Sequence, residues 1–361
     1  MKRKAKSISQ ILSGSSIHND KSYKSPEVSI MKLKNLKVLV TGGAGFIGSN
    51  LVDELAKENN VVILDDFSSG ERENILHHEG KENVDIVTGD VRDQNLLFAI
   101  TRNVDIVYHL AVQCLRISIK NPEITHEVNV TGTLNLLKAS LENAVQRFVY
   151  VSSSEVYGTA RHVPMDEMHT CEPITVYGAS KLAGELYTLA YQKTYGLASM
   201  VVRPFNTYGP REHLQGVYGE VIPRFVLRIL SDRPPVIFGD GTQTRDFTYV
   251  SDTVRGIIMA SECDSLIGQV VNIARGHEVS INDLARIIAE KLGKKNVTPV
   301  YEQKRPGDVM RHYADISKAG SLLGFQPEID IEQGISHYID WFLSRNYNIP
   351  ELLKQESVFN W

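Results

Sequence analysis

The chain has 361 residues, of which 42% are hydrophobic and 23% are charged, and its formal net charge is −4 at pH 7. This composition predicts a soluble globular protein of one large or two moderate domains, and the slightly negative charge argues against a general affinity for nucleic acid. Cys114, Cys171 and Cys263 lie far apart without metal-ligand spacing. We therefore expect a reducing, cytoplasmic compartment, no disulfide framework and no metal site. No apolar run is long enough to span a bilayer, so no membrane association is expected.

Residues 1–34 form an N-terminal extension that is rich in Lys and Ser. The extension lacks the long apolar stretch of a secretory signal. A targeting or docking role is one interpretation, and a variable tail is the one we favour.

Short apolar runs, typical of buried parallel strands, follow the extension. They lie at residues 37–41, 61–64, 84–88, 106–110, 148–152 and 199–203. Segments with the apolar spacing of helices separate these runs, beginning with residues 47–57. This alternation predicts the α/β class, with a doubly wound parallel sheet of the Rossmann type.

The alternation becomes looser in the second half of the chain. Residues 221–230 and 280–293 have helical patterns, and the loops between them are rich in Gly, Pro and Arg. We expect a Rossmann domain at 35–204 with part of 243–275 returning to it, a smaller α/β substrate-binding domain mainly at 205–348, and a tail at 349–361.

A glycine turn follows the first predicted strand. Gly42, Gly45 and Gly48 have G-x-x-G-x-x-G spacing, and Asp65 ends the next strand twenty positions after Gly45. Glycines let the backbone approach a pyrophosphate at the N-terminus of a helix. A carboxylate at the end of the second strand suits the free ribose hydroxyls of NAD and would repel the extra phosphate of NADP. The sequence therefore predicts that the first domain binds NAD.

Tyr177 and Lys181 are four residues apart in "TVYGASK" and would share one face of a helix. A nearby ammonium favours the phenolate, so we expect Lys181 to lower the pKa of Tyr177 and make it a base near neutral pH. The start of an ordinary amphipathic helix would give the same spacing.

Several segments together resemble the extended short-chain dehydrogenase/reductase family, and more narrowly its nucleotide-sugar epimerases and dehydratases of the UDP-glucose 4-epimerase type. The segments are "TGGAGFIGSNL", "LDDFSSG", "GDVRD", "HLA", "VSSSEVYG", "YGASK", "RPFNTYGPR", "GDGTQTRDFTYVSD", "VVNIARG" and "RPGDVMRHYAD". The resemblance runs from about Lys37 to Trp341.

The resemblance implies that NAD stays bound while a sugar hydroxyl, usually at C4, loses its proton to Tyr177. Lys181 would hold the nicotinamide ribose, Ser153 would hydrogen-bond the reacting hydroxyl, and Asn129 would position the cofactor. Asp90 is expected near the adenine, although a helix cap is an equal reading. The remaining cofactor contacts that it implies are Phe46, Ile47, Asp66, Val91, Leu110 and Ala111.

The resemblance also implies a nucleotide-sugar substrate, with UDP as the commonest nucleotide. Arg245 and Arg305 would clamp the diphosphate, because bidentate Arg suits phosphate geometry. Asn206 would contact the diphosphate and the sugar, and Val221 would begin a helix beneath the base.

Four further residues bear on the reaction, and they point in different directions. Glu155 matches the base of the 4,6-dehydratases, but Ser154 replaces their acid; an equal reading makes Glu155 a structural carboxylate. Arg116 would suit a glucuronate carboxylate, whereas a carboxylate at Glu220 would repel one. His312 is expected to narrow the space beside the sugar and to disfavour 2-acetamido sugars.

A UDP-hexose 4-epimerase is the first interpretation. The alternatives are a 4,6-dehydratase or a UDP-glucuronate decarboxylase or 4-epimerase that uses Glu155, and, from another class, a non-catalytic binder of NAD or a sugar nucleotide. The resemblance further implies a homodimer formed through the helix that carries Tyr177.

Overall fold

The computed structural model describes residues 31–214, 216–304 and 307–356. The expectations for residues 1–30 and for Arg305 therefore lie outside the described residues. Within the described residues, no helix combines the length and the apolar character that crossing a membrane requires.

A seven-stranded parallel sheet forms the centre of the molecule, in the order β11-β6-β5-β4-β1-β2-β3. The strands are β1 (Lys37–Thr41), β2 (Asn60–Asp65), β3 (Val84–Thr88), β4 (Ile106–His109), β5 (Arg147–Val151), β6 (Ser199–Pro204) and β11 (Val270–Ile273). All six predicted strands are present, and the predicted Rossmann-type α/β class is confirmed.

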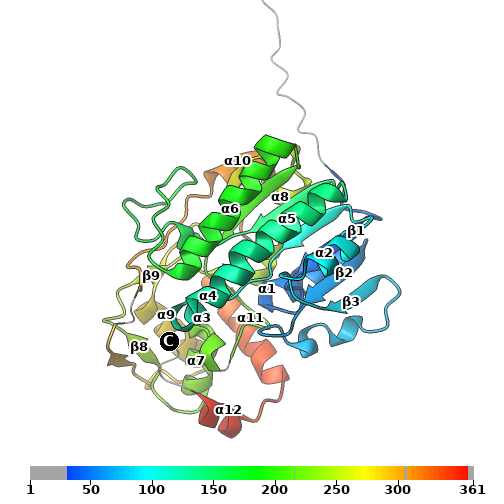
Figure 1. Cartoon of the computed structure of the whole chain (residues 1–361). Helices are drawn as coiled ribbons and strands as arrows, with labels where there is room; N and C mark the ends of the chain where they lie inside the picture. The colour runs from blue at the N-terminus through cyan, green and yellow to red at the C-terminus, as the bar shows by residue number, and fades with distance from the viewer. Residues whose placement is uncertain (1–30, 215, 305–306, 357–361) are drawn as a thin grey trace, which may run out of the picture.

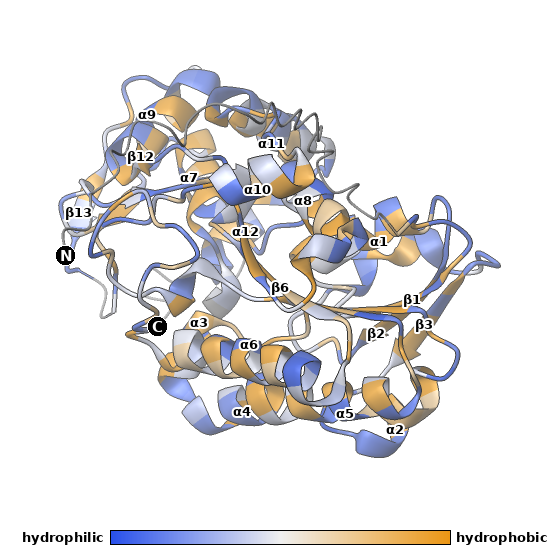
Figure 2. Cartoon of the chain, turned by 90° about the horizontal axis from the view of Figure 1, so that it is seen from above, coloured by the Kyte–Doolittle hydropathy of each residue, from blue (hydrophilic) through white to orange (hydrophobic). Residues whose placement is uncertain are grey.

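Helices cover both faces of the sheet, as Figure 2 shows from above. One layer contains α2 (Gln94–Ile100), α3 (Leu115–Lys120), α4 (Pro122–His126), the π-helix η4 (Glu127–Gly132), α5 (Thr133–Glu142) and α6 (Val176–Tyr195). The other contains α1 (Phe46–Leu55), α8 (Val250–Glu262) and α10 (Ser317–Leu323). Buried apolar side chains fill the space between the sheet and each layer.

A second region, with its own apolar core, lies beside the carboxyl ends of the strands (Figure 1). Its helices are α7 (Val221–Leu230), α9 (Ile281–Lys291), α11 (Ile331–Ser344) and α12 (Ile349–Gln355). Three two-stranded pairs accompany them: β7 (Thr207–Tyr208) with β10 (Thr248–Tyr249), β8 (Val236–Phe238) with β13 (Val300–Glu302), and β9 (Thr244–Arg245) with β12 (Val279–Ser280). The predicted helices at 221–230 and 280–293 are both present, while the domain boundaries stay a prediction.

Short 3-10 helices complete the connections. They are η2 (Arg72–Asn74), η3 (Leu76–His78), η5 (Ser154–Val156), η6 (Gly216–Tyr218) and η7 (Asp264–Leu266). η5 and η6 lie in loops that border the cleft described below.

Helix α6 has clear start and stop signals in the sequence. The Thr175 hydroxyl caps its first turn by accepting a hydrogen bond from the Gly178 amide at 3.0 Å. Gly196 ends the helix in the left-handed conformation, at φ 75°. These caps fix where the helix begins and so place Tyr177 in its first turn.

A buried ion pair joins α6 to the sheet. Arg203 of β6 binds both carboxylate oxygens of Glu185, at 2.9 and 2.6 Å, and both side chains are almost fully buried. The Arg203 guanidinium also lies 4.7 Å from the centre of the Tyr157 ring. This pair holds α6 in place one turn beyond Lys181.

Candidate active site

A cleft of about 460 Å³ lies at the carboxyl ends of the strands, between the sheet and the second region. Ligands of open α/β sheets bind at this edge. The cleft brings together most of the predicted site residues: Gly42, Gly45, Phe46, Ile47, Gly48, Asp65, Asp66, Asp90, Val91, Leu110, Ala111, Arg116, Ser153, Glu155, Tyr177, Lys181, Asn206, Glu220, Val221 and Arg245.

The three glycines of the turn have different tasks. A Cβ on Gly42, which has φ +69°, would lie 2.7 Å from the Ala111 nitrogen, and a Cβ on Gly48 would lie 2.1 Å from the Gly42 oxygen. These two glycines therefore allow close backbone packing. Gly45 caps α1 with no side-chain hydrogen bond, and the first turn of α1 carries no acidic residue. The N-terminus of α1 thus fits an anion such as the pyrophosphate of NAD.

Asp65 supports the same turn. Its carboxylate accepts hydrogen bonds from the amides of Ala44 at 2.8 Å and Phe67 at 2.9 Å. Burial raises its pKa, and these two hydrogen bonds counter that effect. The position at the end of β2 suits the ribose hydroxyls of NAD.

The Asp90 carboxylate forms an ion pair with a neighbouring residue, Arg92. Arg92 binds its carboxylate at 2.6 Å, and this hydrogen bonding lowers the Asp90 pKa. Asp90 still lines the cleft, so its contact with the adenine stays a prediction.

Tyr177, Ser153 and Lys181 meet at one end of the cleft. Ser153 hydrogen-bonds the Tyr177 hydroxyl and also caps η5. The Lys181 ammonium donates to the Val151 carbonyl at 2.7 Å and lies 4.3 Å from the centre of the Tyr150 ring. Two elements therefore hold the three groups: the end of β5 and the first turns of α6.

The pKa of Tyr177 differs from the sequence-based prediction. Burial raises it, the Ser153 hydrogen bond lowers it, and the charge of Glu155 raises it further. Burial also lowers the pKa of Lys181 to about 7. The net pKa of Tyr177 is therefore raised, whereas the sequence predicted a lowered pKa, because desolvation disfavours the phenolate and outweighs the other contributions.

Asn129 does not line the cleft. Its side-chain carbonyl accepts a hydrogen bond from the Gln113 backbone amide at 2.7 Å, and its side-chain NH₂ group donates to the Gln113 backbone carbonyl and to the Ser180 hydroxyl. Asn129 joins the loop after β4 to the helix that carries Tyr177, and its role in positioning the cofactor stays a prediction.

His109 extends this network beneath the site. Its two ring nitrogens lie 2.7 Å from the Thr41 hydroxyl and 2.9 Å from the Thr133 hydroxyl. The Thr133 hydroxyl donates to the backbone carbonyl of Asn129 at 2.6 Å, so the Thr133 oxygen accepts a hydrogen bond from one ring nitrogen of His109. The Thr41 hydroxyl then donates to the other ring nitrogen. The network connects β1 and β4 to the π-helix.

Arg116 and Glu220, which are 104 positions apart in the sequence, form an ion pair in the wall of the cleft. Arg116 is buried and also donates to the Tyr218 carbonyl at 2.8 Å. These two residues favoured opposite substrates when their segments were considered separately, and the structure shows that they form an ion pair.

Arginines gather at the other end of the cleft. Arg245 binds Asp308 at 2.5 Å and the carbonyls of Thr244 and Val309. The NH₂ nitrogen of Asn206 is buried without a hydrogen-bond partner among the described residues. A buried donor without a partner is unfavourable, so this end of the cleft suits an anionic ligand such as a diphosphate.

Comparisons with known proteins establish the family. The family model described as GDP-mannose 4,6 dehydratase matches residues 39–338. The chain belongs to this family. The resemblance to nucleotide-sugar epimerases and dehydratases is thereby confirmed.

The relatives within and around the GDP-mannose 4,6-dehydratase family include several epimerases. A UDP-glucose 4-epimerase of Mycolicibacterium smegmatis is 36% identical over 315 residues, which cover 86% of this chain and all of that protein. An epimerase from Methanothermobacter thermautotrophicus has a TM-score of 0.83 at 36% identity, covering 88% of this chain and 95% of that chain. A UDP-N-acetylglucosamine 4-epimerase from Methanobrevibacter ruminantium, in complex with UDP-N-acetylmuramic acid, has a TM-score of 0.82 at 37% identity, covering 86% and 99%.

Arg224 and Arg228 are cleft residues that the sequence analysis missed in this dehydratase-family chain. Both lie on α7 and pair with Glu356 of the C-terminal tail, Arg228 at 2.9 Å and Arg224 at 3.8 Å. The i, i+4 spacing of two arginines after Val221 was the available signal, because such residues share a helix face.

His312 does not line the cleft, and the prediction that it narrows the sugar space is wrong. The side chain is fully buried against Phe205, and its Nε2 lies 3.3 Å from the Gly158 carbonyl. Burial and the charge of Arg245 lower its pKa to about 3. His312 is therefore a core residue behind the wall of the cleft.

We expect the buried His312 to make the protein sensitive to acid. Its pKa of about 3 in the folded protein lies below the ordinary histidine value of 6.5, so below pH 6.5 the unfolded chain binds the extra proton and the native state does not. Its contribution to the unfolding free energy falls by about 1.4 kcal/mol per pH unit toward pH 3. Urea unfolding between pH 6 and pH 4 should show a steeper loss for the wild type than for His312→Phe. Asp246 and Glu212, whose raised pKa values act in the opposite direction, are common to both proteins. Equal slopes would contradict the assignment.

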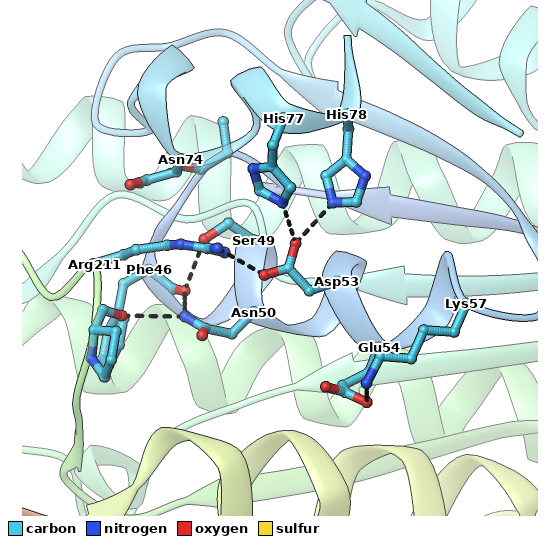
Figure 3. A network of polar contacts seen from close by, with 12 residues as sticks. Phe46, Ser49, Asn50, Asp53, Glu54, Lys57, Asn74, His77, His78 and Arg211 are labelled. Atoms are coloured by element: carbon cyan, nitrogen blue, oxygen red, sulfur yellow. Dashed lines mark hydrogen bonds and ion pairs between the residues drawn. The ribbon is translucent and has the colours of Figure 1, made fainter. Parts of the chain in front are cut away.

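Asp53 ties the cofactor helix to the loop that leads to the cleft (Figure 3). One of its carboxylate oxygens lies 2.7 Å from the Nε2 atoms of both His77 and His78, and the other accepts from Arg211 at 2.7 Å. The Asp53, His77 and His78 ligand atoms lie within 4.8 Å of one another, as in a metal site. However, Arg211 binds Asp53 and Lys81 lies 3.3 Å from His78, so cations already compensate this cluster. We interpret the cluster as a structural polar network that joins α1, η3 and the loop at Arg211.

Proposed function

We propose that this chain is a UDP-hexose 4-epimerase that acts through a transient 4-keto sugar. Its family and its structural neighbours make it an NAD-dependent enzyme of the nucleotide-sugar epimerase and dehydratase group. The observation that supports the proposal most is the cleft itself, whose lining includes Ser153, Tyr177 and Lys181 together with the arginines Arg224, Arg228 and Arg245.

Tyr177 is the base in the proposed mechanism. Its hydroxyl is bonded to Ser153, so both oxygens can face the C4 hydroxyl of the sugar. Because burial opposes the phenolate, the proposal requires positive charge beside the ionised Tyr177. It assigns that charge to the protonated form of Lys181, one turn further along α6. The Val151 carbonyl fixes Lys181 in that position. Bound NAD supplies the acceptor and donor of the C4 hydride.

The second half of the reaction reverses the first. The 4-keto sugar turns within the cleft, Tyr177 returns the proton to the C4 oxygen, and the hydride comes back on the opposite face. The diphosphate stays anchored by the arginine end, which allows the sugar to turn without leaving. No residue has to remove the C5 proton.

A dehydratase or a decarboxylase is the second candidate, and Glu155 favours it. Glu155 lines the cleft and its charge raises the pKa of Tyr177, so the carboxylate lies near the reacting phenol. A 4,6-dehydration also needs an acid to expel the C6 hydroxyl. Ser154, buried beside Glu155, offers only a hydroxyl there. We therefore place the epimerase first.

Product analysis tests the function. The purified protein is incubated separately with UDP-glucose, UDP-N-acetylglucosamine and UDP-glucuronate, and the products are examined by mass spectrometry and proton NMR. An unchanged mass with an inverted C4 signal supports the epimerase. Loss of water or carbon dioxide would assign the chemistry to Glu155, and no turnover of any substrate would favour a non-catalytic binder.

A homodimer through α6 is part of the proposal. Leu186, Tyr187 and Tyr195 are apolar or aromatic side chains of α6 that are 60%, 40% and 58% exposed. Helix α5 lies beside α6 (Figure 1). An exposed apolar face of this kind suits a subunit contact. Light scattering should give about twice the chain mass of 40.4 kDa, and Leu186→Glu should give the monomer; a wild-type monomer would contradict the dimer.

A cytoplasmic location agrees with three unpaired cysteines.

A further inference from the structure

The ion pair of Arg116 and Glu220 controls the charge of the sugar end of the cleft. Arg116 lies in the first turn of α3, after the loop that follows β4, and Glu220 is the N-cap residue of α7. Arg116 is bound by the Glu220 carboxylate and by the Tyr218 carbonyl. One segment, which contains Tyr218 and Glu220, therefore holds the guanidinium in one orientation.

Other carboxylates of the described residues lie near this pair. The charges of Glu155 and Glu220 both raise the pKa of Tyr177, which places both carboxylates within electrostatic range of the reacting phenol. Glu212 lies behind them, and burial, with the charge of Glu220, raises its pKa well above the usual value. Arg116 is the cation that faces these carboxylates, and Glu220 already neutralises it.

We propose that Glu220, by pairing with Arg116, makes the sugar subsite select neutral hexoses and reject uronates. This inference rests on the proposed function, since it assumes that the sugar occupies the Tyr177 end of the cleft. A uronate carboxylate there would meet Glu155 and Glu220 and would have to compete for a guanidinium that is already paired. A neutral hexose presents hydroxyl groups, which donate hydrogen bonds to the same carboxylates.

The pair also explains why an arginine in the sugar pocket need not signal a uronate substrate. In Glu220→Gln we expect the Tyr218 carbonyl to keep Arg116 in place, with less of its charge compensated and more of it open to an anionic sugar. Selectivity between neutral and anionic sugars would then depend on whether the Arg116 guanidinium is paired with Glu220, a residue on another segment.

The test compares the wild type with Glu220→Gln, Glu220→Asp and the double variant Arg116→Gln/Glu220→Gln. For each protein, kcat/KM is measured for UDP-glucose and UDP-glucuronate, and the affinity for both is measured by calorimetry. We expect the glucuronate-to-glucose ratio to rise by about tenfold or more in Glu220→Gln. It should stay near wild type in Glu220→Asp, which keeps the charge, and should lose the gain in the double variant.

Glu356→Gln is the matched control, because it removes the same charge beside the arginines at the other end of the cleft. It should change both substrates alike and leave their ratio unaltered. An unchanged ratio in Glu220→Gln, or the same gain in the double variant, would overturn the inference. If the wild type turns over no UDP-hexose, the proposed function fails, and the calorimetric ratios still decide whether Glu220 selects against uronates.

Discussion

The Tyr177→Phe variant is expected to lose about 10²- to 10⁴-fold in kcat while it remains folded. The change removes one buried hydroxyl that is hydrogen-bonded to Ser153 and leaves the ring in place. Lys181 should keep its position, because its ammonium is anchored to the Val151 carbonyl rather than to Tyr177. The loss should therefore appear in kcat, with little change in the affinity for the nucleotide sugar.

Tyr108→Phe is the control for this prediction. Tyr108 is fully buried, its hydroxyl is hydrogen-bonded to Ser261 at 2.6 Å, and it does not line the cleft. Its loss should affect stability more than turnover. Full activity in Tyr177→Phe would remove the base from the mechanism, and a loss of similar size in Tyr108→Phe would show that the effect comes from the fold.

The Glu185→Ala variant is expected to lower the free energy of unfolding by about 3–5 kcal/mol. Glu185 and Arg203 are almost completely buried, and one terminal nitrogen of Arg203 already lacks a partner among the described residues. Removing the carboxylate leaves a buried guanidinium with the Tyr157 ring as its remaining neighbour. Urea unfolding of the purified protein measures the change.

Glu290→Ala is the matched comparison, because Glu290 pairs with Arg286 at 3.3 Å on the exposed face of α9. Its removal should cost less than about 1 kcal/mol. The double variant Glu185→Leu/Arg203→Met should recover much of the stability that Glu185→Ala loses, since it leaves no buried charge. Equal effects of Glu185→Ala and Glu290→Ala would contradict a buried, desolvated pair.

Local patterns in the sequence predicted the sheet well. Each run of apolar residues from 37–41 to 199–203 became a strand, because a parallel strand buried on both faces needs a continuous apolar segment. Strand β11 was not among the predicted runs. It has four residues and pairs with β6 at the edge of the sheet, and so short a run carries little local signal.

The arrangement within the cleft depended on contacts that the sequence does not contain. Arg116 and Glu220 looked contradictory, because nothing in their local segments shows that they are partners. His312 was expected beside the sugar, but its burial depends on Phe205 and Gly158, far away in the chain. The predicted shift of the Tyr177 pKa had the wrong direction, because the i, i+4 spacing indicates a neighbouring charge and says nothing about desolvation.

The most direct test of the account follows one hydrogen atom. The protein is incubated with UDP-glucose that carries deuterium at C4, and the product is analysed by mass spectrometry and proton NMR. If C4 is oxidised and reduced within one cleft, with Tyr177 moving only the hydroxyl proton, UDP-galactose should form with deuterium still at C4. Loss of the label to solvent, or a product that has lost water, would contradict the proposed epimerase.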